Sequence, residues 1–364
     1  MNSLEYNNLM AFHPGYYVEE IIDDMEITQE EFATRLGTTP KTVSKLVSGQ
    51  INLTSDLAQK LSVMLGTGID VWLNIQTTYI QKKMEIEQKR LLDEQSDIVK
   101  FIDYNYFVEN GFLPPARKSE DKIINLCSYL KVSNLSAFKE HDFLVNFRAG
   151  VSQIETKNLI NAQIWIQTAM NIAKKSQVKP FNAALVRNYI PEIRLMTVQS
   201  PNIFIPRLHE IFCECGVSFV LLPHLKNSGI NGAVRWIGEE KVILAMNDRR
   251  NFSDTFWFSL FHEIKHVLQQ KLKTTFISAS IHEMMQTDDK FERDADSFAQ
   301  EALIPKDAYK KFIQNLHYSD TDIVSFANSI GIHPGIVVGR LQHDGHIAHN
   351  RCLKLKEKYR ITMN

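Results

Sequence analysis

Two histidines stand four positions apart in the segment F-H-E-I-K-H at residues 261–266, with a glutamate directly after the first. Residues four apart lie on the same face of a helix, so His262 and His266 can direct both imidazoles to one point. This H-E-x-x-H spacing is typical of zinc sites in which the histidines bind the metal and the glutamate, here Glu263, acts as a general base. Because so short a motif also arises by chance, the interpretation needs a third ligand.

A third ligand is available downstream, in the predicted helix FERDADSFAQEALIP (291–305). Glu292 lies near the start of this helix, far enough after His266 for a loop and a return helix. Asp296 falls one turn later on the same face, where it can accept a hydrogen bond from a ligating imidazole. His262, His266 and Glu292 therefore predict a divalent-metal site, and the N,N,O ligand set favours Zn2+. The nearby pair His282-Glu283 has no second histidine at the required spacing, and we interpret it as loop.

The predicted reaction is hydrolysis of a peptide bond. Three protein ligands leave a fourth zinc position for water, and Glu263 would take the proton of that water and pass it to the leaving amine. A donor to the developing oxyanion is also expected. The sequence does not place this donor, and Tyr309, His343 and His346 are the candidates.

The segments before the motif predict the elements that position it. Residues 253–270 form an apolar-faced helix with Ser253 or Asp254 as its cap. Residues 216–223, 230–238 and 241–248 are rich in Val, Ile and aromatic residues and predict two hairpin-connected strands plus a neighbour. We expect 230–238 or 241–248 to be an exposed edge that binds a substrate peptide as one more strand.

The H-E-x-x-H motif and the segment that begins at Glu292 together resemble the corresponding motifs of the ImmA/IrrE metallopeptidase family. The sequence NFSDTFWFSLFHEIKHVLQQ is followed by E-x-x-A-D-x-F-A-x-x-x-L-I-P at 292–305, and the resemblance covers about residues 200–345. Residues 331–345 are also similar to members fused to a helix-turn-helix. The resemblance implies a gluzincin-like α+β fold and cleavage of a partner transcriptional repressor.

A second functional region lies near the N-terminus, where two short helices joined by a tight turn are predicted. Thr28 with Glu31 forms a capping-box pattern, Gly37 is a helix stop, and Pro40 stands at the first position of the next helix. This arrangement predicts a helix-turn-helix whose second helix enters the DNA major groove. Its predicted DNA-binding residues are Thr39, Lys41, Thr42, Ser44 and Lys45.

Charge favours an alternative, a small helical bundle with no DNA role. Residues 1–80 contain four Lys or Arg and ten Asp or Glu, a balance of 4 − 10 = −6, whereas a DNA-binding surface should be positive. The acids, however, crowd into residues 19–31, and the proposed reading helix carries Lys41 and Lys45 without an acid.

This region resembles the HigA-type antitoxin branch of the XRE helix-turn-helix family. The match covers about residues 13–80, from HPGYYVEEI through TQEEFATRLGTTPKTVSKLVSGQ to WLNIQTTY. It implies a five-helix DNA-binding domain that is usually dimeric and acts as an autorepressor. We therefore expect a homodimer on a palindromic operator in double-stranded DNA.

Composition sets the remaining bounds. Lys+Arg is 41 and Asp+Glu is 42, with 44% hydrophobic residues, which is typical of a soluble globular protein. No apolar run is long enough for a membrane span, the start lacks the features of a signal peptide, and four cysteines are few, so we predict a cytoplasmic location with reduced thiols.

The predicted organisation is a multidomain, mainly α chain with a small antiparallel β-sheet. We expect a helix-turn-helix domain at 1–80, a helical connector at 81–200, a zinc metallopeptidase domain at 201–345 and a C-terminal tail at 346–364. The favoured function is a DNA-targeted zinc endopeptidase that cleaves a repressor or antitoxin. The alternative is a regulator or antitoxin whose peptidase-like domain only binds metal or a partner protein.

Overall fold

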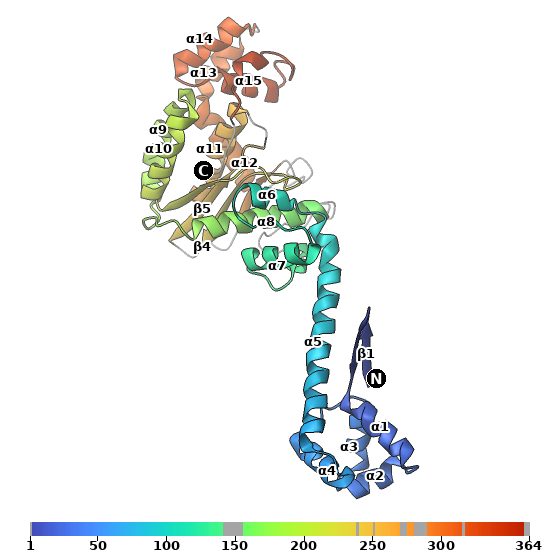
Figure 1. Cartoon of the computed structure of the whole chain (residues 1–364). Coiled ribbons are helices and arrows are strands. Elements are labelled where there is room, and N and C mark those ends of the chain that lie inside the picture. The colour runs from blue at the N-terminus through green and yellow to red at the C-terminus, as the bar shows by residue number, and fades with distance from the viewer. Residues whose placement is uncertain are drawn as a thin grey trace. The chain divides into compact units, whose positions relative to one another are not determined.

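The structure is a computed structural model of the 364-residue chain (Figure 1). It describes residues 2–140, 156–237, 240–249, 252–269, 275–279, 290–314 and 317–359, and the chain divides into two compact units, residues 1–97 and 98–364. The multidomain, mainly α architecture with small sheets is confirmed. The pair His282-Glu283 lies outside the described residues.

The first unit contains the five predicted helices and, before them, a two-stranded antiparallel hairpin that was not expected from the sequence pattern. The hairpin turns at Asn7, whose φ of 53° lies in the left-handed region that asparagine tolerates. The elements of this unit are β1 (Ser3–Tyr6), β2 (Leu9–Phe12), α1 (Pro14–Asp24), α2 (Gln29–Leu36), α3 (Pro40–Val47), α4 (Ser55–Leu65) and α5 (Ile69–Val99).

Local signals explain the turn between α2 and α3. The Thr28 side chain accepts the Glu31 N–H and Gly37 ends α2 at φ 67°, as predicted. Only half of the capping box forms, because the Glu31 carboxylate pairs with Arg35 instead of returning to Thr28. Pro40 then opens α3 at its first position. The helix-turn-helix is therefore specified by its own caps.

Close packing fixes α1 against α3. A Cβ added at Gly15 would lie 1.9 Å from the Leu46 carbonyl oxygen, so only glycine allows this approach. The buried His13 side chain caps α1 by accepting the Gly15 N–H at 2.9 Å, and its ring packs edge-on against Tyr79. Val43, Leu46 and Val47 of α3 face the core, as predicted.

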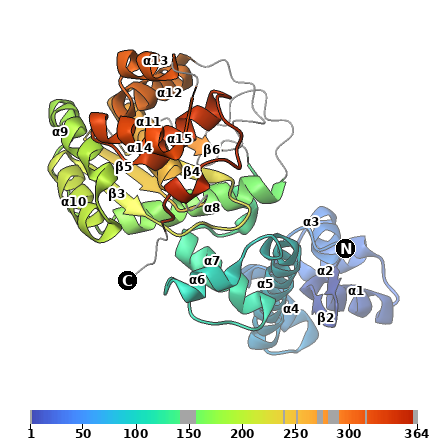
Figure 2. The same cartoon turned by 90° about the horizontal axis from the view of Figure 1, so that it is seen from above.

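The second unit is built around a four-stranded sheet with helices on both faces (Figure 2). Its strands are β3 (Val217–Leu221), β4 (Ile230–Ile237), β5 (Lys241–Met246) and β6 (Thr275–Ala279). Its helices are α6 (Tyr104–Glu109), α7 (Ser119–Leu130), α8 (Thr156–Ala173), α9 (Ala183–Leu195), α10 (Pro201–Glu214), α11 (Ser253–Gln269), α12 (Lys290–Leu303), α13 (Lys306–Ile313), α14 (Asp320–Ile330) and α15 (Pro334–His343).

The strand order is β3-β5-β4-β6. The predicted hairpin β4–β5 is antiparallel, as is β4–β6, whereas β3 pairs with β5 in parallel. The prediction that 230–238 or 241–248 is an exposed edge is wrong, because β4 lies between β5 and β6, and β5 lies between β3 and β4. The cause is β6, which follows α11 in sequence and covers the open side of β4. Among the described strands, the edges are β3 and β6.

Successive buried residues along β3 and β5 show that both faces of the sheet are covered. Val242, Leu244 and Met246 belong to one core together with α11, whereas Ile243 and Ala245 are buried on the opposite side. On that side α8 contacts both β3 and β5. Helix α8 is buried on all sides along most of its length, so it is an internal element of this unit.

Candidate metal centre

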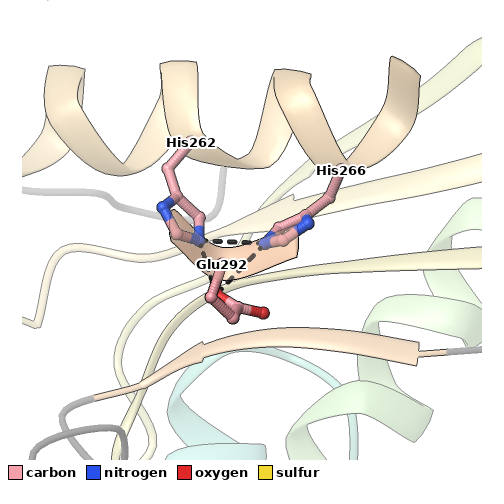
Figure 3. A group of neighbouring side chains, drawn as sticks. All are labelled: His262, His266 and Glu292. Carbon is pink, nitrogen blue, oxygen red and sulfur yellow. Dashed lines mark hydrogen bonds and ion pairs between the residues drawn. The ribbon is translucent and has the colours of Figure 1, made fainter. Parts of the chain in front are cut away.

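Helix α11 holds His262 and His266 beneath the molecular surface. Its apolar residues, among them Trp257 and Ile264, are buried in the core, which fixes the rotation of the helix. Both histidines then lie on one face, 5% and 0% exposed, with their Nε2 atoms 2.9 Å apart (Figure 3). The local geometry is that of two imidazoles directed to one point.

The start of α11 differs from the prediction. Neither Ser253 nor Asp254 caps the helix, because Ser253 is already its first residue and its N–H donates to the Glu357 carbonyl at 2.8 Å. Asp254 instead pairs with Lys356 at 2.7 Å, and both side chains are nearly buried. The C-terminal segment therefore ties down the start of the metal-site helix.

Helix α12 brings Glu292 to the two histidines. It packs along α11 through Ala295 and Ala299, small residues that are fully buried and allow close approach. Glu292 Oε2 lies 3.2 Å from His262 Nε2 and 3.4 Å from His266 Nε2. The predicted ligand atoms all lie within 4.8 Å of one another, and this is the group of side chains among the described residues that could hold a metal ion.

Outer hydrogen bonds orient both imidazoles. His262 Nδ1 lies 2.9 Å from Asp296 Oδ1, the partner that the sequence predicts, and His266 Nδ1 lies 2.9 Å from Gln269 Oε1. Gln269 is held in turn because its Nε2 donates to the Phe291 carbonyl at 3.1 Å. Donation of each Nδ1–H to these partners would leave each Nε2 lone pair facing the common point, which is the tautomer that a metal requires. Gln269 was not found from sequence, because glutamine at this spacing belongs to no metal-ligand pattern.

The electrostatics of the centre favour positive charge. Burial alone would lower the pKa of His262, but hydrogen bonds to Asp296 and Glu292 outweigh it and raise this pKa to about 10. Burial likewise raises the pKa of Glu292, yet hydrogen bonds from His262 and His266 bring it well below its ordinary value.

Tetrahedral zinc at about 2.05 Å from each nitrogen needs ligand atoms about 3.3 Å apart. The observed spacings of 2.9, 3.2 and 3.4 Å fit that need.

Glu263 is fully buried between α11 and the sheet. The strand β4 passes so close that a Cβ added at Gly232 would lie 2.8 Å from Glu263 Oε1 and 2.9 Å from Met246 Sδ. The absence of a side chain at Gly232 therefore makes the room that the carboxylate occupies.

A cavity of about 510 Å3 opens beside the ligands, and His262, Glu292 and Asp296 line it. Of the three candidate oxyanion donors, His343 lines this cavity. Tyr309 instead donates its hydroxyl to Asp344 at 2.8 Å, and the His346 ring packs near those of Tyr309 and Tyr318.

The predicted DNA-binding residues gather on the outer face of α3. Lys41, Ser44 and Lys45 are exposed, and Thr42 is half-buried. Thr39 caps the helix by accepting the Thr42 N–H at 3.2 Å. The two lysines therefore lie on the exposed surface of α3, whereas the acids of residues 19–31 lie on α1, α2 and the turn between them.

Among the described residues, no second group of His, Cys, Asp and Glu side chains lies close enough together to hold a metal ion. The cysteines Cys127, Cys213, Cys215 and Cys352 are free. Within the described part of the chain, no helix combines the length and apolar character needed to cross a membrane.

Two family models match the chain. A helix-turn-helix model matches residues 18–72, and the model of the IrrE N-terminal-like domain, Peptidase_M78, matches residues 229–342. The second match contains the ligands and Glu263.

Individual relatives match the N-terminal part. The uncharacterized HTH-type transcriptional regulator YddM of Escherichia coli K12 is 34% identical over 92 residues, 24% of this chain and 98% of the relative. Virulence-associated protein I of Dichelobacter nodosus is 30% identical over 86 residues, 23% of this chain and 80% of the relative. A solved structure of a proposed antidote protein of a plasmid maintenance system from Nostoc punctiforme is 31% identical, covering 23% of this chain and 92% of its own, with a TM-score of 0.23.

Proposed function

Because the chain belongs to the helix-turn-helix family at its N-terminus and carries an IrrE N-terminal-like domain of the M78 peptidases at its C-terminus, we propose that it is a zinc-dependent endopeptidase brought to DNA by its own recognition helix, α3. Its substrate class would be a partner transcriptional repressor or antitoxin, cleaved in the cytoplasm to change gene expression. The observation that carries the proposal is the metal centre with a buried glutamate, Glu263, next to its first ligand in sequence.

Five side chains would bind the metal ion or orient its ligands. His262, His266 and Glu292 would hold the ion, and Asp296 and Gln269 would keep the imidazoles in the ligating tautomer. A zinc ion held here supplies Lewis acidity, which makes a water molecule easier to deprotonate and polarises a peptide carbonyl.

Glu263 would accept the proton at a carboxylate oxygen and return it to the amine that leaves. Its burial between α11 and β4 holds the carboxylate in a fixed place, with Gly232 directly against it. A regulator that merely binds metal needs the three ligands and has no need of this carboxylate, which supports the enzyme over the binding-only alternative.

The bound peptide would extend the sheet at β6 rather than at β4 or β5. Of the two edge strands described, β6 is the one that pairs with β4, the strand next to Glu263. Addition of a peptide strand at such an edge uses main-chain hydrogen bonds, so affinity would demand little of the substrate sequence.

The helix-turn-helix supports the proposed route to the substrate. YddM is named a transcriptional regulator, and the similar Nostoc punctiforme protein is named an antidote protein. We propose that a homodimer of this chain binds a palindromic operator through Thr39, Lys41, Thr42, Ser44 and Lys45. Binding there would concentrate the peptidase where a repressor of the same promoter sits.

Co-expression with the proteins encoded beside it tests the function. Wild type should cleave one of them, whereas Glu263→Gln should keep zinc and fold but lose cleavage, because only the proton acceptor is removed. Glu301→Gln makes the same chemical change at an exposed position of α12 and is the matched control. Full cleavage by Glu263→Gln would refute the assigned base. A zinc-loaded wild type that cleaves none of its neighbours would favour the binding-only alternative.

A further inference from the structure

Strand β4 carries an extra residue where it reaches the metal centre. Ile230 and Gly232 pair with neighbouring residues of β6, so Asn231 between them has no partner of its own. Such a β-bulge breaks the alternation of side chains and redirects one of them. Gly232 faces Glu263, and Asn231 lines the same cavity as Glu292, so two consecutive residues serve one site.

Neighbouring side chains hold the bulge in place. Arg249 Nη1 donates to the Gly229 carbonyl at 2.9 Å and Asn247 Nδ2 donates to the Ile230 carbonyl at 2.8 Å. The Asn247 N–H donates to the Asn231 carbonyl at 3.2 Å. The backbone on both sides of Asn231 is thereby fixed, as a preorganised binding group requires.

Arg249 also determines which end of the Asn231 amide faces the cavity. Its guanidinium can only donate, and it lies 3.5 Å from Asn231 Oδ1, so the amide oxygen turns toward it. The amide nitrogen is left as the outward group, and no acceptor among the described residues binds it. This nitrogen carries two N–H donors, and Asn231 lines the cavity together with His262 and Glu292.

We propose that Asn231 is a substrate-binding residue whose Nδ2 donates a hydrogen bond to a carbonyl oxygen of the peptide bound in the cavity. The inference rests on the proposed peptidase function. It commits the site to an acceptor-rich, extended ligand such as a peptide backbone, because the amide nitrogen can only donate. The β4 bulge is needed for this contact, because a regular strand would turn the Asn231 side chain to the face opposite Gly232.

Calorimetric binding to the full zinc-loaded chain tests the assignment with two probes. N-phosphoryl-Leu-Ala offers a metal-binding group and a peptide backbone, whereas acetohydroxamate offers the metal-binding group alone. Asn231→Ala and Asn231→Asp should each weaken the phosphoryl peptide about 3- to 10-fold, the loss typical of one neutral hydrogen bond. Acetohydroxamate affinity and zinc content should not change. Asn328→Ala, at an exposed position of α14, should bind both probes as wild type does.

Three results would overturn the proposal in distinguishable ways. Equal affinity of Asn231→Ala and wild type for the phosphoryl peptide would show that Asn231 makes no contact with the ligand. Loss of acetohydroxamate or zinc binding in both Asn231 variants would show a structural role instead. A zinc-loaded wild type that binds acetohydroxamate but not the phosphoryl peptide would remove the peptidase function itself, and this inference with it.

Discussion

A single methyl group at Gly232 should impair catalysis without disturbing the metal. The added Cβ of Gly232→Ala would lie 2.8 Å from Glu263 Oε1, 2.9 Å from Glu263 Cγ and 2.9 Å from Met246 Sδ, whereas ordinary contacts are 3.4 to 4 Å. The missing space is therefore about 0.5 Å or more against three atoms at once. Strand β4 cannot retreat, because β5 and β6 hold it on both sides.

The size of this overlap sets the expected loss of stability and of cleavage rate in Gly232→Ala. Overpacking of a well-filled core costs about 1 to 3 kcal/mol. For a domain of this size each kcal/mol lowers Tm by about 2 to 4 °C. Because Glu263 must move to make room, and a misplacement of about 1 Å can cost about 100-fold in rate, we expect Gly232→Ala to cleave about 10- to 100-fold more slowly. Zinc content should stay at the wild-type level, since no ligand is touched.

A double-mutant cycle isolates the contact. Thermal unfolding would compare the cost of Gly232→Ala in wild type and in Glu263→Ala, where most of the crowded side chain is gone. We expect a clearly smaller cost in the second background. An equal loss of stability in both, or a Gly232→Ala protein with wild-type Tm and cleavage, would refute the steric argument.

Further substitutions test the metal, the DNA contact and a buried histidine. His262→Ala should reduce zinc from about one per chain to a trace by metal analysis, and Asp296→Asn should weaken zinc about 10- to 100-fold in a chelator competition; retained occupancy in both would disprove the site. Lys41→Ala with Lys45→Ala should weaken operator binding and lower the slope of log K against log salt by about 2, and an unchanged gel-shift titration would exclude α3 as the reader. Burial lowers the pKa of His13 below its ordinary 6.5, so the unfolded state binds the proton more readily. The stability due to this residue is then complete above about pH 6.5 and declines below it; Tm measured from pH 8 to pH 5 should fall less for His13→Asn, and parallel profiles would contradict this.

Features governed by neighbouring residues could be predicted from the sequence. The helix cap at Thr28, the helix stop at Gly37 and the start at Pro40 act within a few positions, and the structure contains all three. The spacing of His262 and His266 likewise fixes their common face once a helix forms. Glu292 came from a longer motif, and its approach depends on how α12 packs on α11.

Features set by distant pairing could not be predicted in this way. Whether β4 is an edge depends on β6, which lies beyond α11 in the chain and joins the sheet only in the folded state. The bulge at Asn231 is invisible in sequence for the same reason, since it is defined by its partner strand. The turn at Asn7 did leave a signal, because two consecutive asparagines, Asn7 and Asn8, are turn-forming residues that tolerate a left-handed backbone.

The burial of α8 bears on how this protein can be divided for biochemistry. A fragment beginning at residue 201 would keep every metal ligand but lose the helix that covers Ile243 and Ala245. The uncovered sheet face would be a continuous apolar surface, which favours aggregation. We expect such a fragment to precipitate during expression. A fragment beginning near residue 98, where the second unit starts, should remain in solution and give the IrrE N-terminal-like domain free of the helix-turn-helix.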